Sequence, residues 1–306
     1  MIQPQALKHG DCVGIIAPAR KIDTDLINAA KTILETWGLK VELGQHLFTN
    51  DHAYFSAHDD KRLEDFQYFL EAGHIRAIIC ARGGYGSTRI IDRLDFEKFL
   101  QQPKWITGYS DITALHLKLQ SLKVQSIHGT VPALFTKQNA EASVSSLKHM
   151  LFGETQPIQV KSDKQNRLGK ASGQLIGGNL SLLVDSLGTS SEVDTDGKIL
   201  IIEDVGEHYY RIDRMLVQLK RANKLKNLAG LVLGYFTDIK ESTLPFNESV
   251  KDIIINHTKE YNFPIAFNFP IGHEEPNLSF IEGAPARLIV NEQEATLDYE
   301  KEFINP

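Results

Sequence analysis

The sequence predicts an α/β protein of two domains, with a parallel β-sheet in the first domain and a mixed α/β arrangement in the second. The first half alternates short apolar runs with amphipathic segments of helical spacing, which is typical of βαβ units. Residues 155–173 are rich in Gln, Lys, Ser and Asp and offer little apolar surface for packing. This stretch predicts a linker, and 306 residues are enough for a domain on either side of it.

The first domain is expected to span residues 1–154. Its strands are predicted at residues 13–17, 40–43, 77–81, 105–107 and 124–127. Its helices are predicted at residues 23–37, 61–72, 88–100 and 112–122. A polar loop at 50–60 and a glycine-rich turn at 83–87 separate these elements.

The second domain is expected to span residues 174–306, where the rhythm of helices and strands changes. Helices are predicted at residues 180–187, 211–221 and 248–261. Strands are predicted at residues 199–202 and 230–233, followed by short ones from 265 through 287–290 to 295–299. These elements predict a mixed α/β domain.

Composition and charge argue against several classes of protein. The chain is 42% hydrophobic and 24% charged, as soluble globular proteins are. Its net charge of −6 disfavours nucleic acid as the main partner, because phosphate-binding surfaces need clustered Lys and Arg. No apolar stretch has the length of a signal peptide or of a bilayer span, so we expect a cytoplasmic protein without a membrane partner.

The chain contains two cysteines, Cys12 and Cys80, and both lie in apolar runs. Cysteine behaves as a small hydrophobic residue, so we expect two buried, reduced thiols. Two cysteines in a chain of this length do not make a disulfide framework.

Ser110 follows a predicted strand and a glycine, Gly108, and a predicted helix begins directly after it. This is the arrangement of a nucleophile elbow, in which the positive end of the helix stabilises an oxyanion. The usual Gly-x-Ser-x-Gly motif is incomplete, because Ile112 occupies the position of the second glycine. The alternative is that Ser110 only caps the helix, as serines often do.

The glycine-rich turn Arg-Gly-Gly-Tyr-Gly-Ser at residues 82–87 follows another predicted strand. Glycines allow a close approach of the backbone, so a backbone N–H near Gly84 is a candidate second oxyanion donor. An ordinary turn and a phosphate-binding loop are the alternatives. The standard phosphate-loop and dinucleotide motifs are absent from the sequence.

The candidate acid is Glu203, at the point where the apolar run 199–202 stops. Functional groups of α/β sheets gather at the carboxyl ends of strands, and a carboxylate there could orient a histidine. Asp204 and Glu207 lie close enough in sequence to compete for this role.

The candidate base is one of eleven histidines. His273 follows an apolar segment in a turn-rich loop, and His128 follows a predicted strand. The sequence His-Glu-Glu-Pro-Asn at 273–277 lacks the second histidine of the His-Glu-x-x-His zinc motif, so no metal site is predicted.

Ten segments along the chain together resemble the LD-carboxypeptidase family, serine peptidases that include muramoyltetrapeptide carboxypeptidase. They occur in the family's order over nearly the whole chain, at residues 10–11, 15–18, 81–86, 108–115, 128–129, 177–183, 203–207, 210–216, 272–273 and 276–278. One departure is Phe-Ile-Glu-Gly at 280–283, where the family commonly has an apolar Leu-Pro-Leu-Gly type of sequence. This departure affects packing near His273 more than chemistry.

The resemblance implies Ser110 as the nucleophile, His273 as general base and acid, and Glu203 as the carboxylate that orients it. It implies an oxyanion hole made by the backbone N–H groups of Asp111 and of the glycine turn, with Gly84 as the candidate. It also implies a flavodoxin-like N-terminal domain, a smaller β-rich C-terminal domain, a homodimer, and no metal or cofactor.

The implied reaction releases C-terminal D-alanine from murein tetrapeptides during cell-wall recycling, by hydrolysis of an L,D-peptide bond. An exopeptidase must recognise a free carboxylate, and Arg82 and Arg211 are the candidates for that contact because they lie near the motifs. Either arginine could instead form a structural ion pair. One alternative within the family is a microcin C-type immunity peptidase that cleaves peptide- or aminoacyl-nucleotides. A nonenzymatic anion-binding protein is the alternative from another class.

Overall fold

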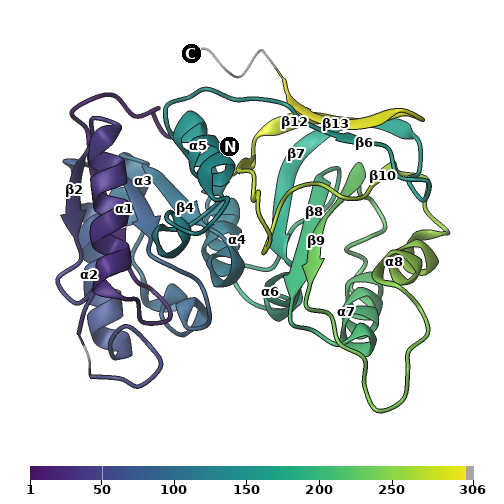
Figure 1. The fold of residues 1–306 in the computed structure, drawn as a ribbon, viewed down its shortest axis with the longest axis horizontal. Coiled ribbons are helices and arrows are strands. Elements are labelled where there is room, and N and C mark those ends of the chain that lie inside the picture. Colours follow the sequence, from purple (N-terminus) through teal and green to yellow (C-terminus); the bar gives the residue numbers. More distant parts are fainter. Residues whose placement is uncertain (50, 301–306) are drawn as a thin grey trace. The chain divides into compact units, whose positions relative to one another are not determined.

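The computed structural model describes residues 1–49 and 51–300, which form two compact units (Figure 1). The first unit contains Met1–Glu154 and a later segment, Glu275–Ile281. The second contains Thr155–Glu274 and continues from Glu282. Asn50, the first residue of the predicted polar loop, and residues 301–306, the end of the predicted second domain, lie outside the described residues.

The first unit is built on a six-stranded sheet with the strand order β2-β1-β3-β4-β5-β11. Its first five strands pair in parallel, and their 2-1-3-4-5 order is that of flavodoxin-like sheets, which confirms the predicted fold class. The bounds are β1 (Cys12–Ile16), β2 (Lys40–Leu43), β3 (Ile75–Cys80), β4 (Trp105–Gly108), β5 (Ser126–His128) and β11 (Phe280–Glu282).

Helices connect these strands in the order that the periodicity predicts. They are α1 (Thr24–Thr36), α2 (Asp59–Glu71), α3 (Glu97–Gln101), α4 (Thr113–Ser121) and α5 (Glu141–Leu151). Helix α1 shows the local cause: Ile27, Ala30 and Leu34 share one buried face, and the carboxylate of Asp23 accepts the backbone N–H of Asp25 at the N-terminus. Helix α5 had no sequence prediction.

The helix predicted at 88–100 is interrupted. Two short 3-10 turns, Ser87–Arg89 and Ile91–Arg93, precede α3. Leu94 is extended, and the carboxylate of Asp95 accepts the backbone N–H of Glu97, which starts a new helix. A side chain that competes with the backbone for hydrogen bonds therefore divides the predicted helix.

The second unit is built on a seven-stranded mixed sheet with the order β10-β9-β8-β7-β12-β13-β6. Strands β7 to β10 are parallel, whereas β12, β13 and β6 add antiparallel pairs. The bounds are β6 (Ile158–Lys161), β7 (Gly169–Asn179), β8 (Ile199–Val205), β9 (Gly230–Thr237), β10 (Ile265–Ala266), β12 (Pro285–Val290) and β13 (Glu294–Tyr299). With the helices below, this confirms the predicted mixed α/β domain.

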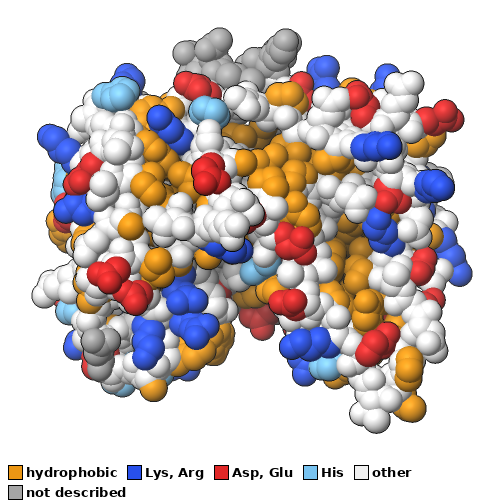
Figure 2. All heavy atoms as spheres, in the orientation of Figure 1, with side chains coloured by type: hydrophobic (Ala, Val, Ile, Leu, Met, Phe, Trp, Pro, Cys, Tyr) orange, Lys and Arg blue, Asp and Glu red, His pale blue; other side chains and the backbone are white. Residues whose placement is uncertain are grey.

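Three helices accompany this sheet, namely α6 (Leu180–Asp185), α7 (Tyr209–Arg221) and α8 (Val250–Thr258). Helices α7 and α8 lie against each other (Figure 1). No helix within the described residues is both long enough and apolar enough to cross a membrane. On the face drawn in Figure 2, acidic and basic side chains are interspersed over each unit, in keeping with the small net charge.

Residues 155–173, expected to form a linker, contain strand β6 and the first residues of β7. Strand β6 is the last strand at its edge of the sheet, and only Ile158 of its four residues is buried. An edge strand that buries so few side chains has a polar sequence, which is why its composition resembles that of a linker.

Candidate active site

Ser110 lies at the end of β4 with a left-handed backbone, φ +64°. This conformation is uncommon for a residue with a side chain, and it is characteristic of strained turns that expose a nucleophile between a strand and a helix. Ser110 starts a 3-10 turn, Ser110–Ile112, that leads into α4. The N-caps are Tyr109 for the turn and Ile112 for α4, so Ser110 is not a helix cap.

A buried histidine of α4 contacts the end of β4. His116 lies within 2.9 Å of the carbonyl oxygen of Gly108 through Nε2, and within 2.8 Å of the Ser126 hydroxyl through Nδ1. Burial lowers the pKa of His116 to about 4. A neutral imidazole therefore links β4, β5 and α4 directly behind the turn. Sequence analysis did not identify His116, because its signal was a histidine among apolar helix residues.

The glycine-rich turn after β3 lies directly against Ser110. A Cβ atom on Gly83 would stand 2.9 Å from the Cβ of Ser110 and 3.1 Å from the carbonyl oxygen of Tyr109, so only glycine fits there. The buried carboxylate of Asp111 accepts the backbone N–H of Ser87 at 2.9 Å. The sequence-predicted residues Ser110, Asp111 and the glycine turn are therefore brought together.

A buried arginine, Arg62, joins this turn to the loop after β1. Its guanidinium donates to the carbonyl oxygens of Pro18 and Gly86, and to the carboxylate of Asp59 at 2.6 Å. Its side chain is only 1% exposed. Sequence analysis missed Arg62, because an arginine on a predicted amphipathic helix has no local sign of burial.

Glu203 and His273 are in direct contact in the second unit. The Nδ1 atom of His273 lies 2.6 Å from Oε2 of Glu203, and the Glu203 side chain is fully buried. A carboxylate in this position fixes the tautomer of a histidine and leaves Nε2 to exchange a proton.

An irregular pairing of β8 and β9 creates the space for this contact. Gly234 and Tyr235 of β9 together stand opposite Glu203, which is a β-bulge. The bulge turns the N–H of Tyr235 to the carbonyl oxygen of Ile271 at 2.8 Å, and this bond attaches the segment that carries His273. At Gly272 (φ +121°), a Cβ would lie 2.7 Å from Oε2 of Glu203.

Asp204 and Glu207, the two other candidates for the acid, have other partners. Asp204 accepts hydrogen bonds from the Asn179 amide at 2.9 Å and the Ser181 hydroxyl at 2.7 Å, which anchors the start of α6. Burial raises the pKa of Asp204 to about 6. Glu207 pairs with Arg211 at 3.6 Å. Of the three candidates, Glu203 is the one in contact with His273.

His128, the rival histidine, lies in the first unit at the end of β5. Its ring is buried and stacks on Phe280, with centroids 4.7 Å apart and planes 20° apart. Phe280 is the first residue of β11, the strand that joins this sheet from the far end of the chain. These contacts give His128 a packing role at the junction of β5 and β11.

The two arginines singled out in the sequence have different surroundings. Arg211 is on α7, in the ion pair with Glu207. Arg82 follows β3 and donates to the carbonyl oxygen of Lys21 at 3.1 Å. Burial and the neighbouring Arg20 lower the pKa of Arg82. Neither Arg20 nor Arg82 forms an ion pair with a carboxylate of the described residues.

Comparison with known proteins identifies the same family in both halves of the chain. The family model for the LD-carboxypeptidase N-terminal domain matches residues 13–129, and the model for the LD-carboxypeptidase C-terminal domain matches residues 172–288. A relative from Bacillus subtilis, named "Probable murein peptide carboxypeptidase", is 37% identical over 97% of this chain and 94% of its own length.

Solved structures show the same fold. A muramoyltetrapeptide carboxypeptidase from Oxalobacter formigenes superposes with a TM-score of 0.85 and 27% identity, over 95% of this chain and 99% of that one. The microcin C7 self immunity protein MccF superposes with a TM-score of 0.86, over 98% of this chain and 99% of its own. At 18% identity, the likeness to MccF concerns the fold alone.

Proposed function

Because this chain belongs to the LD-carboxypeptidase family, we propose that it releases C-terminal D-alanine from murein tetrapeptides, with Ser110, His273 and Glu203 as its catalytic triad. The observation that carries the assignment is the 2.6 Å contact between His273 and the buried Glu203. The strained backbone of Ser110, between a strand and a helix, supports its role as nucleophile.

In the proposed reaction, Glu203 accepts the Nδ1–H of His273, so that Nε2 takes the hydroxyl proton of Ser110. The serine oxygen attacks the carbonyl carbon before the terminal residue and forms a tetrahedral intermediate. His273 then gives its proton to the amine of D-alanine, and the C–N bond breaks. Water, activated by His273, hydrolyses the acyl-enzyme and regenerates the serine hydroxyl.

The oxyanion of this intermediate is proposed to bind the backbone N–H groups of Asp111 and Gly84. Two observations support this: Gly83 packs against Ser110 without room for a side chain, and the Asp111 carboxylate holds Ser87 at the far end of the same turn. Preorganised backbone donors of this kind stabilise developing charge without reorganising during the reaction.

The terminal carboxylate of the substrate is proposed to bind Arg82, with Arg20 as a second contact. Both arginines follow strands on either side of the point where the strand order reverses, between β1 and β3, where doubly wound sheets bind their ligands. Two guanidinium groups close together without a carboxylate partner favour an anionic ligand. Arg211, with Glu207 as its partner, is the weaker candidate.

The substrate assignment is tested with three tetrapeptides that end in D-alanine, L-alanine or D-alanine amide, with products identified by mass spectrometry. We expect cleavage of the first peptide alone, because the chirality and the free carboxylate are both recognised. Equal cleavage of all three would remove both claims. Cleavage of an aminoacyl nucleotide, with the tetrapeptide untouched, would assign the chain to the microcin C-type activity instead.

The triad is tested with matched pairs of variants. His273→Ala is expected to lower kcat by several orders of magnitude, whereas His128→Ala is expected to retain most of the wild-type kcat. Glu203→Gln keeps the shape of the side chain but disturbs the tautomer of His273, and is expected to lower kcat about 10³–10⁴-fold. Asp204→Asn, one residue away, serves as its control. The reverse result in either pair would reassign that role.

Covalent labelling separates an enzyme from a nonenzymatic anion-binding protein. A serine-reactive fluorophosphonate is expected to label the wild-type protein at Ser110 and to leave Ser110→Ala unlabelled. Label on a different serine would place the nucleophile elsewhere.

The assembly is proposed to be a homodimer, as the family resemblance implies, and to lie in the cytoplasm, where recycled murein peptides appear. Sedimentation equilibrium would then give twice the chain mass of 34.3 kDa. A mass that stays at 34.3 kDa at micromolar concentration would refute the dimer. Fractionation of cells, with the protein followed by an antibody, tests the compartment.

A further inference from the structure

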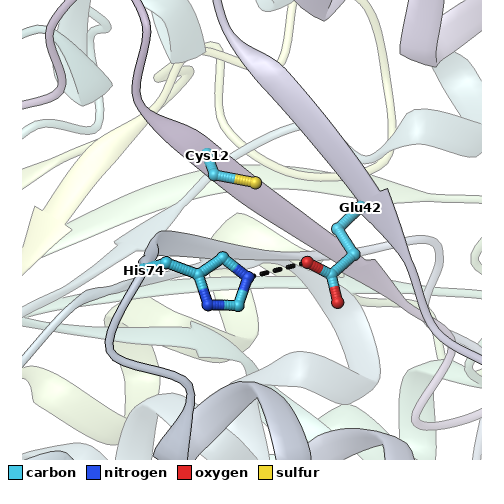
Figure 3. Close-up of side chains that lie close together, drawn as sticks. All are labelled: Cys12, Glu42 and His74. Carbon is cyan, nitrogen blue, oxygen red and sulfur yellow. Dashed lines mark hydrogen bonds and ion pairs between the residues drawn. The ribbon is translucent and has the colours of Figure 1, made fainter.

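A group of potential metal ligands lies at the edge of the first unit's sheet opposite to Ser110. Cys12 is the first residue of β1, Glu42 lies in β2, and His74 directly precedes β3 (Figure 3). One ligand atom from each side chain lies within 4.8 Å of the other two. Because these strands are parallel, their amino ends lie at the opposite edge from the turn that carries Ser110.

The pairing of the strands explains why the three side chains converge. Cys12 pairs with Lys40 and Gly14 pairs with Glu42, so Cys12 and Glu42 are offset by two residues and point to the same face. His74 arrives beside Cys12 because β3 begins there, with Ile75 paired to Cys12. Nothing local in the sequence connects these three positions.

The donor atoms suit zinc. A thiolate sulfur, an imidazole nitrogen and a carboxylate oxygen are its usual protein ligands, at about 2.0–2.3 Å from the metal. Tetrahedral zinc needs its donor atoms about 3.3–3.7 Å apart, so a thiol that lies up to 4.8 Å from the other two donor atoms must approach them by up to about 1 Å. The Nε2 atom of His74 and Oε2 of Glu42 lie 2.8 Å apart and must separate by about 0.5 Å, so that their hydrogen bond is exchanged for bonds to the metal.

Solvent reaches the group. The side chains of His74 and Glu42 are 55% and 35% exposed, and Cys12 is only partly buried, contrary to the sequence expectation of two buried thiols.

We propose that Cys12, Glu42 and His74 bind one zinc ion, with water as the fourth ligand. The metal would tie the starts of β1 and β3 to β2 and so stabilise the first unit. It lies at the edge away from Ser110 and takes no part in the proposed hydrolysis. The site is therefore independent of the proposed function, and its failure would leave that function untouched.

The experiment titrates zinc into the metal-free full-length protein against a chromophoric chelator. Variants Cys12→Ser and His74→Gln each remove one ligand at a solvent-accessible position, and circular dichroism checks that they fold. His46→Gln is the matched control, because His46 forms a similar pair with Glu64 at 3.2 Å but has no thiol in its group.

The expected result is one zinc per chain in the wild-type protein and in His46→Gln, and at least a tenfold weaker affinity in Cys12→Ser and His74→Gln. Zinc at about 100 times its Kd should raise the wild-type Tm by about 5 °C. Cobalt should give the near-ultraviolet absorption of a cobalt–thiolate bond, which Cys12→Ser abolishes. Equal affinity in wild type and Cys12→Ser, or no binding by the wild type, overturns the proposal.

Discussion

At the scale of single residues, the backbone of Ser110 is the feature with the clearest consequence. A non-glycine residue in the left-handed region has about 1–2 kcal/mol of strain, because its Cβ approaches the carbonyl oxygen. The packing of Gly83 and the hydrogen bond from Ser87 to Asp111 keep the turn in this shape. Strain held in place by its surroundings is typical of functional sites.

Two variants of Ser110 separate the effect of losing the hydroxyl from the effect of relieving the backbone strain. Ser110→Ala and Ser110→Gly are both expected to abolish turnover, because both lack the nucleophile. The free energy of unfolding of Ser110→Gly should be about 1 kcal/mol higher than that of Ser110→Ala, since glycine adopts φ +64° without strain. Urea denaturation measures this difference. Equal stabilities would mean that the backbone of Ser110 is not strained, and turnover by either variant would remove Ser110 as nucleophile.

His116 predicts how stability depends on pH. Its pKa is about 4 in the folded protein and 6.5 without the fold's influence, so the unfolded chain binds more protons between these values. The contribution of the neutral His116 to the stability of the fold is therefore complete above pH 6.5 and is lost as the pH falls toward 4. Integration between pH 7 and pH 5 gives about 2 kcal/mol.

The measurement compares the free energy of unfolding at pH 7 and pH 5 for the wild type and for His116→Gln. From pH 7 to pH 5, the free energy of unfolding of the wild type should fall by about 2 kcal/mol more than that of the variant. The comparison is needed because Asp204, with its raised pKa of about 6, acts in the opposite direction over the same range. Identical pH profiles for the two proteins would contradict a buried, neutral His116.

At the scale of elements, close approach of strands depends on individual glycines. Gly177 in β7 has φ +148°, and a Cβ there would lie 1.8 Å from the carbonyl oxygen of Ile201 in β8. Strand β8 continues to Glu203, so the pairing that Gly177 permits also fixes the position of the proposed acid. No side chain larger than hydrogen fits without separating the two strands.

Gly177→Ala is expected to destabilise the protein by more than about 3 kcal/mol, because the two backbones must move apart. Gly188→Ala is the control: it also has positive φ, +79°, but nothing lies within 4 Å of the added Cβ. It should show only the backbone strain, about 1–2 kcal/mol. Thermal unfolding of both variants measures the contrast. A similar loss in both would mean that strain alone, and not the contact with Ile201, accounts for the effect.

At the scale of the whole molecule, the proposed catalytic groups come from two units of the chain, Ser110 from the first and Glu203 with His273 from the second. The proposed zinc ligands all belong to the first unit. Hydrolysis and metal binding should therefore respond independently to the same treatment.

Removal of metals tests this independence. After treatment with EDTA, the protein is expected to retain full carboxypeptidase activity, because the proposed mechanism uses side chains and backbone donors of the chain and no metal. The Tm should fall as zinc leaves Cys12, Glu42 and His74. A loss of activity that added zinc restores would contradict the mechanism, and the ligand variants would show whether this cluster is responsible.

The sequence by itself determined most of the elements and the identity of the family. Short apolar runs and helical spacing are local properties, so most strands and helices of the first unit follow from their own residues, with α5 as an exception. The motif around Ser110 is also local, since the consecutive residues 108–113 make the strand end, the turn and the helix start. Prediction failed where the local pattern was ambiguous, as in the polar strand β6.

Only the tertiary structure decided which separated residues meet. Asp204 and Glu207 compete with Glu203 in the sequence, and it is the bulge opposite Glu203 that brings His273 to Glu203. The group of Cys12, Glu42 and His74 likewise depends on the register of three strands. A sequence pattern determines which face a side chain occupies, but the partner across a sheet depends on strand order and register, which are set by packing of the whole unit.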